Sequence, residues 1–210
     1  MKSVRKGWSQ LKSALMGAMF CMLMASATVH ATAIAFGGAV IAGCTLSGKT
    51  YTCASSPTTY TDAVAVGADY IVTITGSGDL HAFTAALGVN GVVNGNLISA
   101  STVALGVGAH VTGDLTAGTT VALGVDAYVV RNMTAGSTVA MGVGSYVGRN
   151  LTAGTTVALG ANSYVCLNLS ALTVAMGAGA FVHRNLTATT ATLGAGAYVN
   201  RDLTAVTVTI

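Results

Sequence analysis

Histidine and cysteine supply many of the reactive groups of catalytic and metal sites, and this 210-residue chain has only four of each. The histidines are isolated from one another: they are His30, His81, His110 and His183. The sequence shows no Ser/His/Asp triad pattern, phosphate-binding loop, carboxylate pair or Cys/His metal cluster. We therefore expect a protein that is not an enzyme, with no catalytic residue, no cofactor and no metal site.

Two of the cysteines delimit the segment C-T-L-S-G-K-T-Y-T-C, from Cys44 to Cys53. Its Ser-Gly-Lys centre fits the turn of a short hairpin, and an oxidising compartment favours a disulfide between the two ends. Two free thiols in a loop are the alternative. Cys166 has no partner at a similar spacing, so it either links two molecules or remains a free thiol.

The elements that would position any site come from a tandem repeat over residues 80–210. An apolar marker recurs every 17 or 18 residues, at Leu80, Leu97, Leu115, Met133, Leu151, Leu169, Leu186 and Leu203. Helical repeats need ~33–45 residues, so this period favours a β-solenoid with one coil per repeat. Three apolar pairs per coil indicate three short strands, with Gly or Asn at the corners. The sequence predicts an all-β, single-stranded β-solenoid of about 7–8 triangular coils.

Stacked coils place equivalent side chains above one another at ~4.8 Å, so each column of the repeat becomes one line on a face. One outward column is a candidate face for ice or another ligand: Thr116, Thr134, Thr152, Thr187 and Thr204. A second column is small: Ala122, Ala140, Ala158, Ala175 and Thr192. A third is aromatic: Tyr128, Tyr146, Tyr164, Phe181 and Tyr198. The aromatic rings either stabilise neighbouring strands or stack a ligand.

Two polar columns fall at one corner of the coil. The first holds Asn or Asp, whose side chains can bond along the axis: Asn96, Asp114, Asn132, Asn150, Asn168, Asn185 and Asp202. Just before it stand Arg131, Arg149, Arg184 and Arg201, with Leu167 interrupting the row. Four guanidiniums in a row either bind a polyanion such as an acidic polysaccharide or keep a weakly charged rod soluble.

Residues 1–33 have the organisation of a secretory signal peptide. A basic start, K-S-V-R-K, precedes an apolar stretch and small-residue cleavage sites that end at Ala31 or Ala33. An uncleaved membrane anchor and lipidation at Cys44 are the alternatives. We expect a bacterial protein that is secreted, periplasmic or on the cell surface, with no membrane contact after cleavage.

The charge balance gives no reason to expect nucleic acid as a partner. The formal net charge is +3, but four of the nine Lys and Arg residues lie in the first 12 positions. The rest of the chain contains the other five, together with six Asp and no Glu, so its formal net charge is −1. The sequence therefore does not predict the broadly positive surface that binds nucleic acid.

Residues 34–79 lack the regular repeat and contain the only proline, Pro57. We expect them to form an N-terminal cap that includes the Cys44–Cys53 hairpin, because a solenoid must protect its first open edge. The sequence stops within a coil at Val208, Thr209 and Ile210, without a polar cap. We expect the unpaired strands there to stack on another copy of the chain.

The segment Gly106–Gly124, G-V-G-A-H-V-T-G-D-L-T-A-G-T-T-V-A-L-G, resembles the bactofilins, a polymer-forming cytoskeletal family. The resemblance covers about residues 80–210 and implies a right-handed triangular β-helix that polymerises end to end without nucleotide. This chain departs from the family in its export signal. It also carries arginines at a corner that is still Gly95 and Gly113 in the early coils.

The last thirteen residues, Y-V-N-R-D-L-T-A-V-T-V-T-I, are similar to the final coils of microbial β-solenoid ice-binding proteins. That resemblance implies a flat, regular, weakly charged binding face, for which the Thr column is the candidate. The chain departs from this family because Gly118 follows Thr116 at the second position, which gives one rank of Thr and no T-x-T pair.

These patterns favour an exported, non-catalytic solenoid that self-associates end to end. An ice-binding protein is the first alternative, and a surface adhesin or polysaccharide-binding module is the second. The expected partners are accordingly further copies of the chain, ice or a cell-surface polysaccharide.

Overall fold

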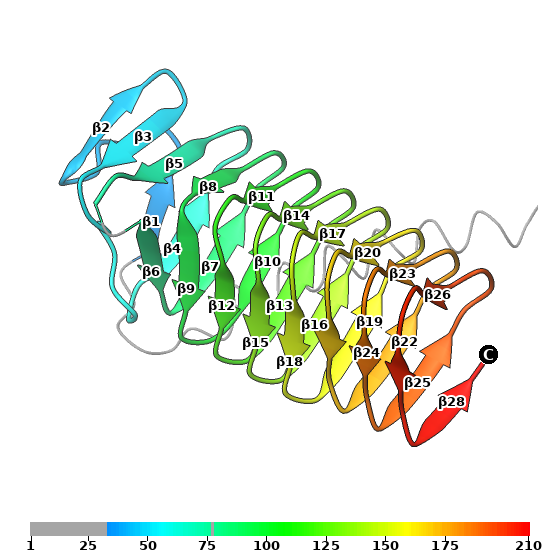
Figure 1. The fold of residues 1–210 in the computed structure, drawn as a ribbon. Coiled ribbons are helices and arrows are strands. Elements are labelled where there is room, and N and C mark those ends of the chain that lie inside the picture. Colours follow the sequence, from blue (N-terminus) through cyan, green and yellow to red (C-terminus); the bar gives the residue numbers. More distant parts are fainter. Residues whose placement is uncertain (1–32, 77) are drawn as a thin grey trace, which may run out of the picture. The chain divides into compact units, whose positions relative to one another are not determined.

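The computed structural model of the protein describes residues 33–76 and 78–210. The predicted signal peptide, apart from Ala33, lies outside the described residues, as does Cys21. The described part consists of strands and turns without a helix, so it contains no helix long and apolar enough to cross a membrane. The strands wind into a β-solenoid of about nine turns, close to the number predicted (Figure 1).

Three sheets form the sides of the solenoid, and each full turn adds one strand to each sheet (Figure 1). Sheet A has ten parallel strands: β1 (Ala33–Phe36), β4 (Ala63–Val66), β7 (Thr84–Leu87), β10 (Val103–Leu105), β13 (Thr120–Leu123), β16 (Thr138–Met141), β19 (Thr156–Leu159), β22 (Thr173–Met176), β25 (Thr190–Leu193) and β28 (Thr207–Thr209).

Sheet B also has ten strands, of which β2 and β3 are antiparallel and the rest parallel. They are β2 (Cys44–Ser47), β3 (Thr50–Cys53), β5 (Ile71–Ile74), β8 (Val92–Asn94), β11 (His110–Val111), β14 (Tyr128–Val129), β17 (Tyr146–Val147), β20 (Tyr164–Val165), β23 (Phe181–Val182) and β26 (Tyr198–Val199). Sheet C has eight: β6 (Asp79–Ala82), β9 (Asn96–Ser99), β12 (Leu115–Ala117), β15 (Met133–Ala135), β18 (Leu151–Ala153), β21 (Leu169–Ser170), β24 (Leu186–Thr187) and β27 (Leu203–Thr204).

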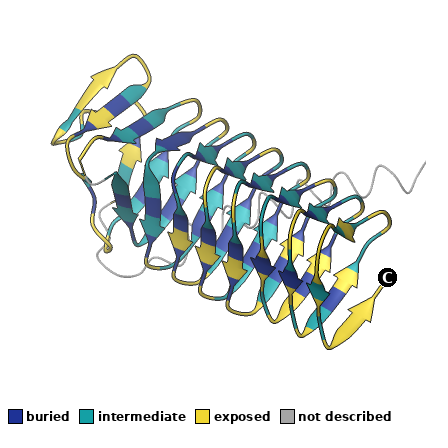
Figure 2. Ribbon diagram, in the orientation of Figure 1, coloured by how far each residue is buried: buried dark blue, intermediate teal, exposed yellow. Residues whose placement is uncertain are grey.

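The core is one apolar cluster enclosed by the three sheets along the axis. In the turn made by β13, β14 and β15, the inward side chains of Val121, Val129 and Met133 have no exposed surface. The register pairs like with like, since Val121 faces Val139 of the next turn. Buried positions alternate with half-exposed or exposed ones along most of the strands (Figure 2). The strand alternation predicted from the apolar pairs is therefore confirmed.

The corner between sheets A and B depends on two backbone features. A Cβ on Gly124 would lie 2.7 Å from the carbonyl carbon of Gly106 in the preceding turn, so the close stacking requires glycine. Two residues later, Asp126 has a φ of 55°, in the left-handed region that Gly, Asn and Asp tolerate. Asn162 and Gly179 occupy the same position in later turns, with φ of 55° and 66°. Each turn thus repeats the same bend.

The N-terminal part of the solenoid carries the predicted hairpin, and the Cys44–Cys53 disulfide joins its ends. A disulfide-bonded Cys44 has no free thiol to accept a lipid. The ring of Tyr51 packs edge-on against Phe36 at 5.1 Å, and both side chains are fully buried at this end of the core. The Tyr51 hydroxyl donates to the Ala39 carbonyl at 2.8 Å, which satisfies the buried phenol.

The long sheets begin upstream of residue 80. Strands β1 and β4 already belong to sheet A, and β5 already belongs to sheet B. The segment between β3 and β4 borders β6, the first strand of sheet C: the Ser56 hydroxyl accepts from the His81 amide at 3.1 Å, and the Thr58 hydroxyl donates to the His81 carbonyl. Side chains of this segment therefore satisfy backbone groups on the outer edge of sheet C.

Candidate functional site

The outer side of sheet A carries two parallel ranks of small side chains, which we call the sheet A face. From β13 onward the first rank is Thr120, Thr138, Thr156, Thr173, Thr190 and Thr207. The second rank is Ala86, Ala104, Ala122, Ala140, Ala158, Ala175, Thr192 and Thr209. All are half-exposed or exposed, and no strand of sheet A contains a charged residue. The face presents only hydroxyl and methyl groups in its strands.

The backbone fixes the spacing of the sheet A face in two directions. Stacked strands are ~4.8 Å apart, and outward positions two residues apart along a strand are separated by about 6.7 Å. Thr156, for example, pairs with Thr138 on one side and with Thr173 on the other. Because threonine is branched at Cβ, few rotamers are open to it, so the hydroxyls and methyls repeat with the backbone. The result is a two-dimensional array.

Sequence reasoning found the second rank of this face and missed the first. Thr120 follows Gly118-Thr119, and the sequence does not show where that corner ends and strand β13 begins. The pattern T-V-A-L-G or T-V-A-M-G, which recurs in five successive coils from Thr102 to Gly177, was the available clue. The expectation of a single Thr rank was made for the strand of Thr116; on the sheet A face, by contrast, Thr190 and Thr192 form a T-x-T pair.

The Thr column predicted as the binding face lies on sheet C. Its members are exposed, as expected: Thr116, Thr134, Thr152, Thr187 and Thr204. From β12 onward each strand of this sheet offers only one such side chain; in β12, for example, Leu115 and Ala117 flank Thr116 and are buried. The sheet C face is therefore a single line of hydroxyls, narrower than the sheet A face.

The Asn and Asp column forms a hydrogen-bonded ladder at the corner between sheets B and C. The Asn132 side-chain amide donates to Asp114 at 2.9 Å, and that of Asn150 donates to the Asn132 carbonyl oxygen at 3.1 Å. The Asn168 amide continues the ladder to Asn150 at 3.0 Å. Backbone amides of the same residues donate to the same oxygens. The predicted bonding along the axis is confirmed, and it occupies these side chains in a structural role.

The aromatic column on sheet B is a continuous stack. Neighbouring rings lie 4.4–5.4 Å apart between centroids and 7–14° from parallel, in the order His110, Tyr128, Tyr146, Tyr164, Phe181 and Tyr198. The faces of each inner ring are covered by the rings above and below. A ligand cannot stack on a face that is already covered, so the geometry supports the stabilising interpretation of this column.

Burial within this stack shifts the titration of three members. Burial lowers the pKa of His110 below its ordinary value, and a hydrogen bond with the Gly108 backbone has a smaller, opposite effect. The Nδ1 atom of His110 is buried and has no hydrogen-bond partner in the described residues. Burial also raises the pKa of Tyr146 and of Tyr164, with smaller contributions from neighbouring phenols and from Cys166. The rings therefore favour their neutral forms.

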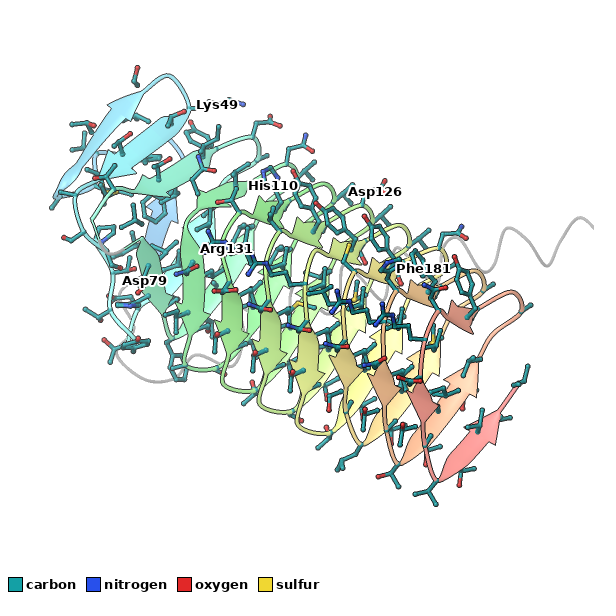
Figure 3. All side chains as sticks on the ribbon, viewed as in Figure 1. Lys49, Asp79, His110, Asp126, Arg131 and Phe181 are labelled. Carbon is teal, nitrogen blue, oxygen red and sulfur yellow. A yellow bond between two sulfur atoms is a disulfide. The ribbon has the colours of Figure 1, made fainter. Side chains whose placement is uncertain are left out.

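The four arginines of the row are all exposed, beside the Asn ladder; Figure 3 shows Arg131 at this corner. Backbone bonds tie the row together: the Arg149 amide donates to the Arg131 carbonyl at 3.1 Å. Across residues 33–76 and 78–210, the one ion pair joins Lys49 to Asp69 at 3.1 Å, far from the row in the sequence. Cys166 is a half-buried free thiol within the same part of the chain.

The last turn exposes several apolar side chains. Val206 is 85% exposed and Ile210 97% exposed, and Val208 of β28 is also exposed. Strands β26, β27 and β28 each pair with a strand on one side only. The predicted self-association residues Val208, Thr209 and Ile210 thus lie at an open edge of sheet A.

Nothing in the described part of the chain groups three or more His, Cys, Asp or Glu side chains where they would hold a metal ion. Comparisons of the chain with family models, with curated proteins and with solved structures found no match. The outer faces and corners of the solenoid are therefore the basis for assigning a function.

Proposed function

We propose that this protein binds the surface of ice through the sheet A face. The observation that carries the proposal is the pair of uncharged Thr and Ala ranks, repeated without insertion from β13 to β28. No other sheet of the described residues offers two such ranks per strand on its outer side. From β12 onward sheet C offers one hydroxyl per strand, and from β11 onward sheet B offers a stack of rings.

The surface of an ice crystal repeats in two directions, and the sheet A face does so too. Each Thr hydroxyl can both donate and accept a hydrogen bond, which is what a water molecule of the lattice requires. The methyl groups of Thr and Ala between them disfavour disordered water. A charged side chain would hold its own hydration shell, and the strands of this sheet have none. Many weak contacts held at fixed spacing add up without loss of side-chain entropy.

The test compares two variants of the same coil. Thr156→Tyr puts a bulky ring on the sheet A face, and Thr152→Tyr puts the same ring on the sheet C face four residues earlier. We expect the unaltered protein to shape ice crystals and to lower their growth temperature, Thr156→Tyr to lose most of this activity, and Thr152→Tyr to keep it. Undisturbed ice growth with the unaltered protein refutes the proposal. Equal loss in both variants refutes the assignment to sheet A.

Self-association, the function that the sequence favoured, is a second candidate. Its support is the exposure of Val206, Val208 and Ile210 beside three unpaired strand edges. The antiparallel hairpin strand β2 terminates sheet B at the other end, which opposes continuous head-to-tail pairing of all three sheets. We therefore expect two last turns to meet, giving a dimer. Light scattering with Val208→Lys tests this: the substitution should yield a monomer, and a strict monomer without it removes this candidate.

Export is part of the same proposal. The Cys44–Cys53 disulfide is compatible with an oxidising extracellular compartment, and the composition of residues 1–33 supports it. Mass determination of the protein recovered from the culture medium tests it, with a mature N-terminus near residue 32 or 34 as the expected result.

A further inference from the structure

The row formed by Arg131, Arg149, Arg184 and Arg201 is the strongest unneutralised charge on the described surface. No Asp or Glu occurs anywhere between residues 127 and 201. None of the four guanidiniums has a carboxylate within ion-pair distance in the described residues, and residues 1–32 contain no acidic residue to supply one. The neighbouring ladder is neutral from Asn132 to Asn185, and Asp202, next to Arg201, is its one acidic member over these turns. Within residues 33–76 and 78–210, the row is thus a line of positive charge that forms no ion pair.

The backbone holds this line straight and at a regular spacing. From Arg149 onward the amide of each member donates to the carbonyl one turn earlier, from Arg149 to Arg131 at 3.1 Å and from Arg201 to Arg184 at 3.2 Å. Leu167 occupies the one intermediate turn and continues the same bonding. With ~4.8 Å per turn, four steps place the outer two arginines about 19 Å apart along the axis. Such a row fits a linear partner that lies parallel to the solenoid axis.

We propose that the arginine row binds an extended acidic polysaccharide, one that carries a carboxylate on its sugar residues. A guanidinium matches a carboxylate with two parallel hydrogen bonds, which favours arginine over a diffuse charge. Single-stranded nucleic acid fits less well, because its binding sites supply ring faces for bases, and the ring faces beside this row are stacked on one another. The net negative balance of the chain beyond its first 12 residues also opposes general attraction to nucleic acid.

The position of the row makes this site independent of the sheet A face. Each turn passes through sheet A, then B, then C, so the corner between B and C is opposite sheet A in the triangular cross-section. A polysaccharide at this corner and a flat surface against sheet A therefore do not compete for space. The protein has the geometry to hold an acidic polymer on one side while its opposite face contacts ice.

The experiment measures binding of the mature protein to polygalacturonate, with dextran as the neutral control polymer. We expect binding at low salt, little at 0.5 M salt because exposed charges are screened, and none to dextran. Each single Arg→Gln change should weaken binding by about two- to fivefold, and the variant with all four replaced by at least about tenfold. Lys49→Gln is the matched control, since it removes one exposed positive charge far from the row, and it should bind as the unaltered protein does.

Three results overturn the proposal. The first is equal binding by the variant with four Gln substitutions. The second is weakening by Lys49→Gln as large as that by Arg149→Gln. The third is tighter binding to duplex DNA or to anionic lipid vesicles than to polygalacturonate, which would assign the row to another class of partner. Thr156→Tyr should leave polysaccharide binding unchanged, so failure of this site and failure of the ice-binding proposal are seen in separate assays.

Discussion

Replacing one asparagine of the ladder with alanine should destabilise the fold, and the hydrogen bonds that are lost set the size of the effect. Asn150 donates from its side-chain amide to Asn132 at 3.1 Å. Its own side-chain oxygen accepts from the Asn168 side-chain amide at 3.0 Å and from the Asn168 backbone amide at 3.2 Å. Asn150→Ala removes all three bonds while leaving the backbone and the apolar core unchanged.

The expected cost is about 2 kcal/mol. Three hydrogen bonds at about 0.5–1.5 kcal/mol each set the range, and water replaces part of the loss because Asn168 is exposed. For a chain of this size, such a loss lowers the melting temperature by roughly 4–8 °C. Asn150→Asp keeps the accepting oxygen but loses the donor to Asn132, so its melting temperature should lie between those of the unaltered protein and Asn150→Ala.

The assay is thermal unfolding followed by far-ultraviolet circular dichroism, with Asn200→Ala as control. Asn200 is exposed, and its side chain makes no hydrogen bond within residues 33–76 and 78–210 that would be lost, so its replacement should move the transition by less than about 1 °C. The combination Asn132→Ala with Asn150→Ala should cost less than the sum of the two, because the two residues share bonds. Equal shifts for Asn150→Ala and Asn200→Ala would refute the structural role of the ladder.

Two further predictions concern the aromatic stack. Tyr146→Ala removes ring contacts at 5.0 and 5.1 Å and should destabilise the fold by about 1–3 kcal/mol, measured by urea unfolding. Tyr146→Phe keeps the ring and should cost little stability. Equal losses of stability in the two variants would contradict stacking as the cause. Burial lowers the pKa of His110 in the folded state, so the unfolded chain binds the proton more readily and stability should fall as the pH drops below about 6.5. His110→Phe should flatten that acid decline in unfolding curves measured from pH 8 to pH 5, and an unchanged slope would remove His110 as its source.

Much of the fold followed from the sequence because the repeat is a local pattern. The recurrence of Leu115, Met133 and Leu151 gave the length of a coil, and the single-residue spacing within apolar pairs gave strands. Cys44 and Cys53 gave the disulfide, since a short hairpin places its ends side by side. The Asn column gave the ladder, because a period that matches one turn places equal residues above one another.

The candidate site could be predicted only in part from such local patterns. Thr116 was recognisable as outward because Leu115 and Ala117 flank it, whereas Thr120 follows a corner whose end has no sequence mark. Strand pairing between Thr120 and Thr138 is what assigns this rank to sheet A, where it lies beside Ala122 and Ala140 and widens the face to two side chains. The sequence also left open whether the tyrosines bind a ligand, and ring angles of 8–10° between Tyr128, Tyr146 and Tyr164 decided against it.

The sequence by itself determined the period, the alternation of inward and outward residues and the identity of each column, because these are properties of neighbouring residues along the chain. The tertiary structure alone decided which columns share a face and which lie opposite. That assignment depends on how far each corner turns the backbone, through Gly124 and the left-handed Asp126, and on the register in which the next turn bonds to the last. Only the tertiary structure shows that the Thr and Ala ranks form one face and that the arginine row lies at the opposite corner.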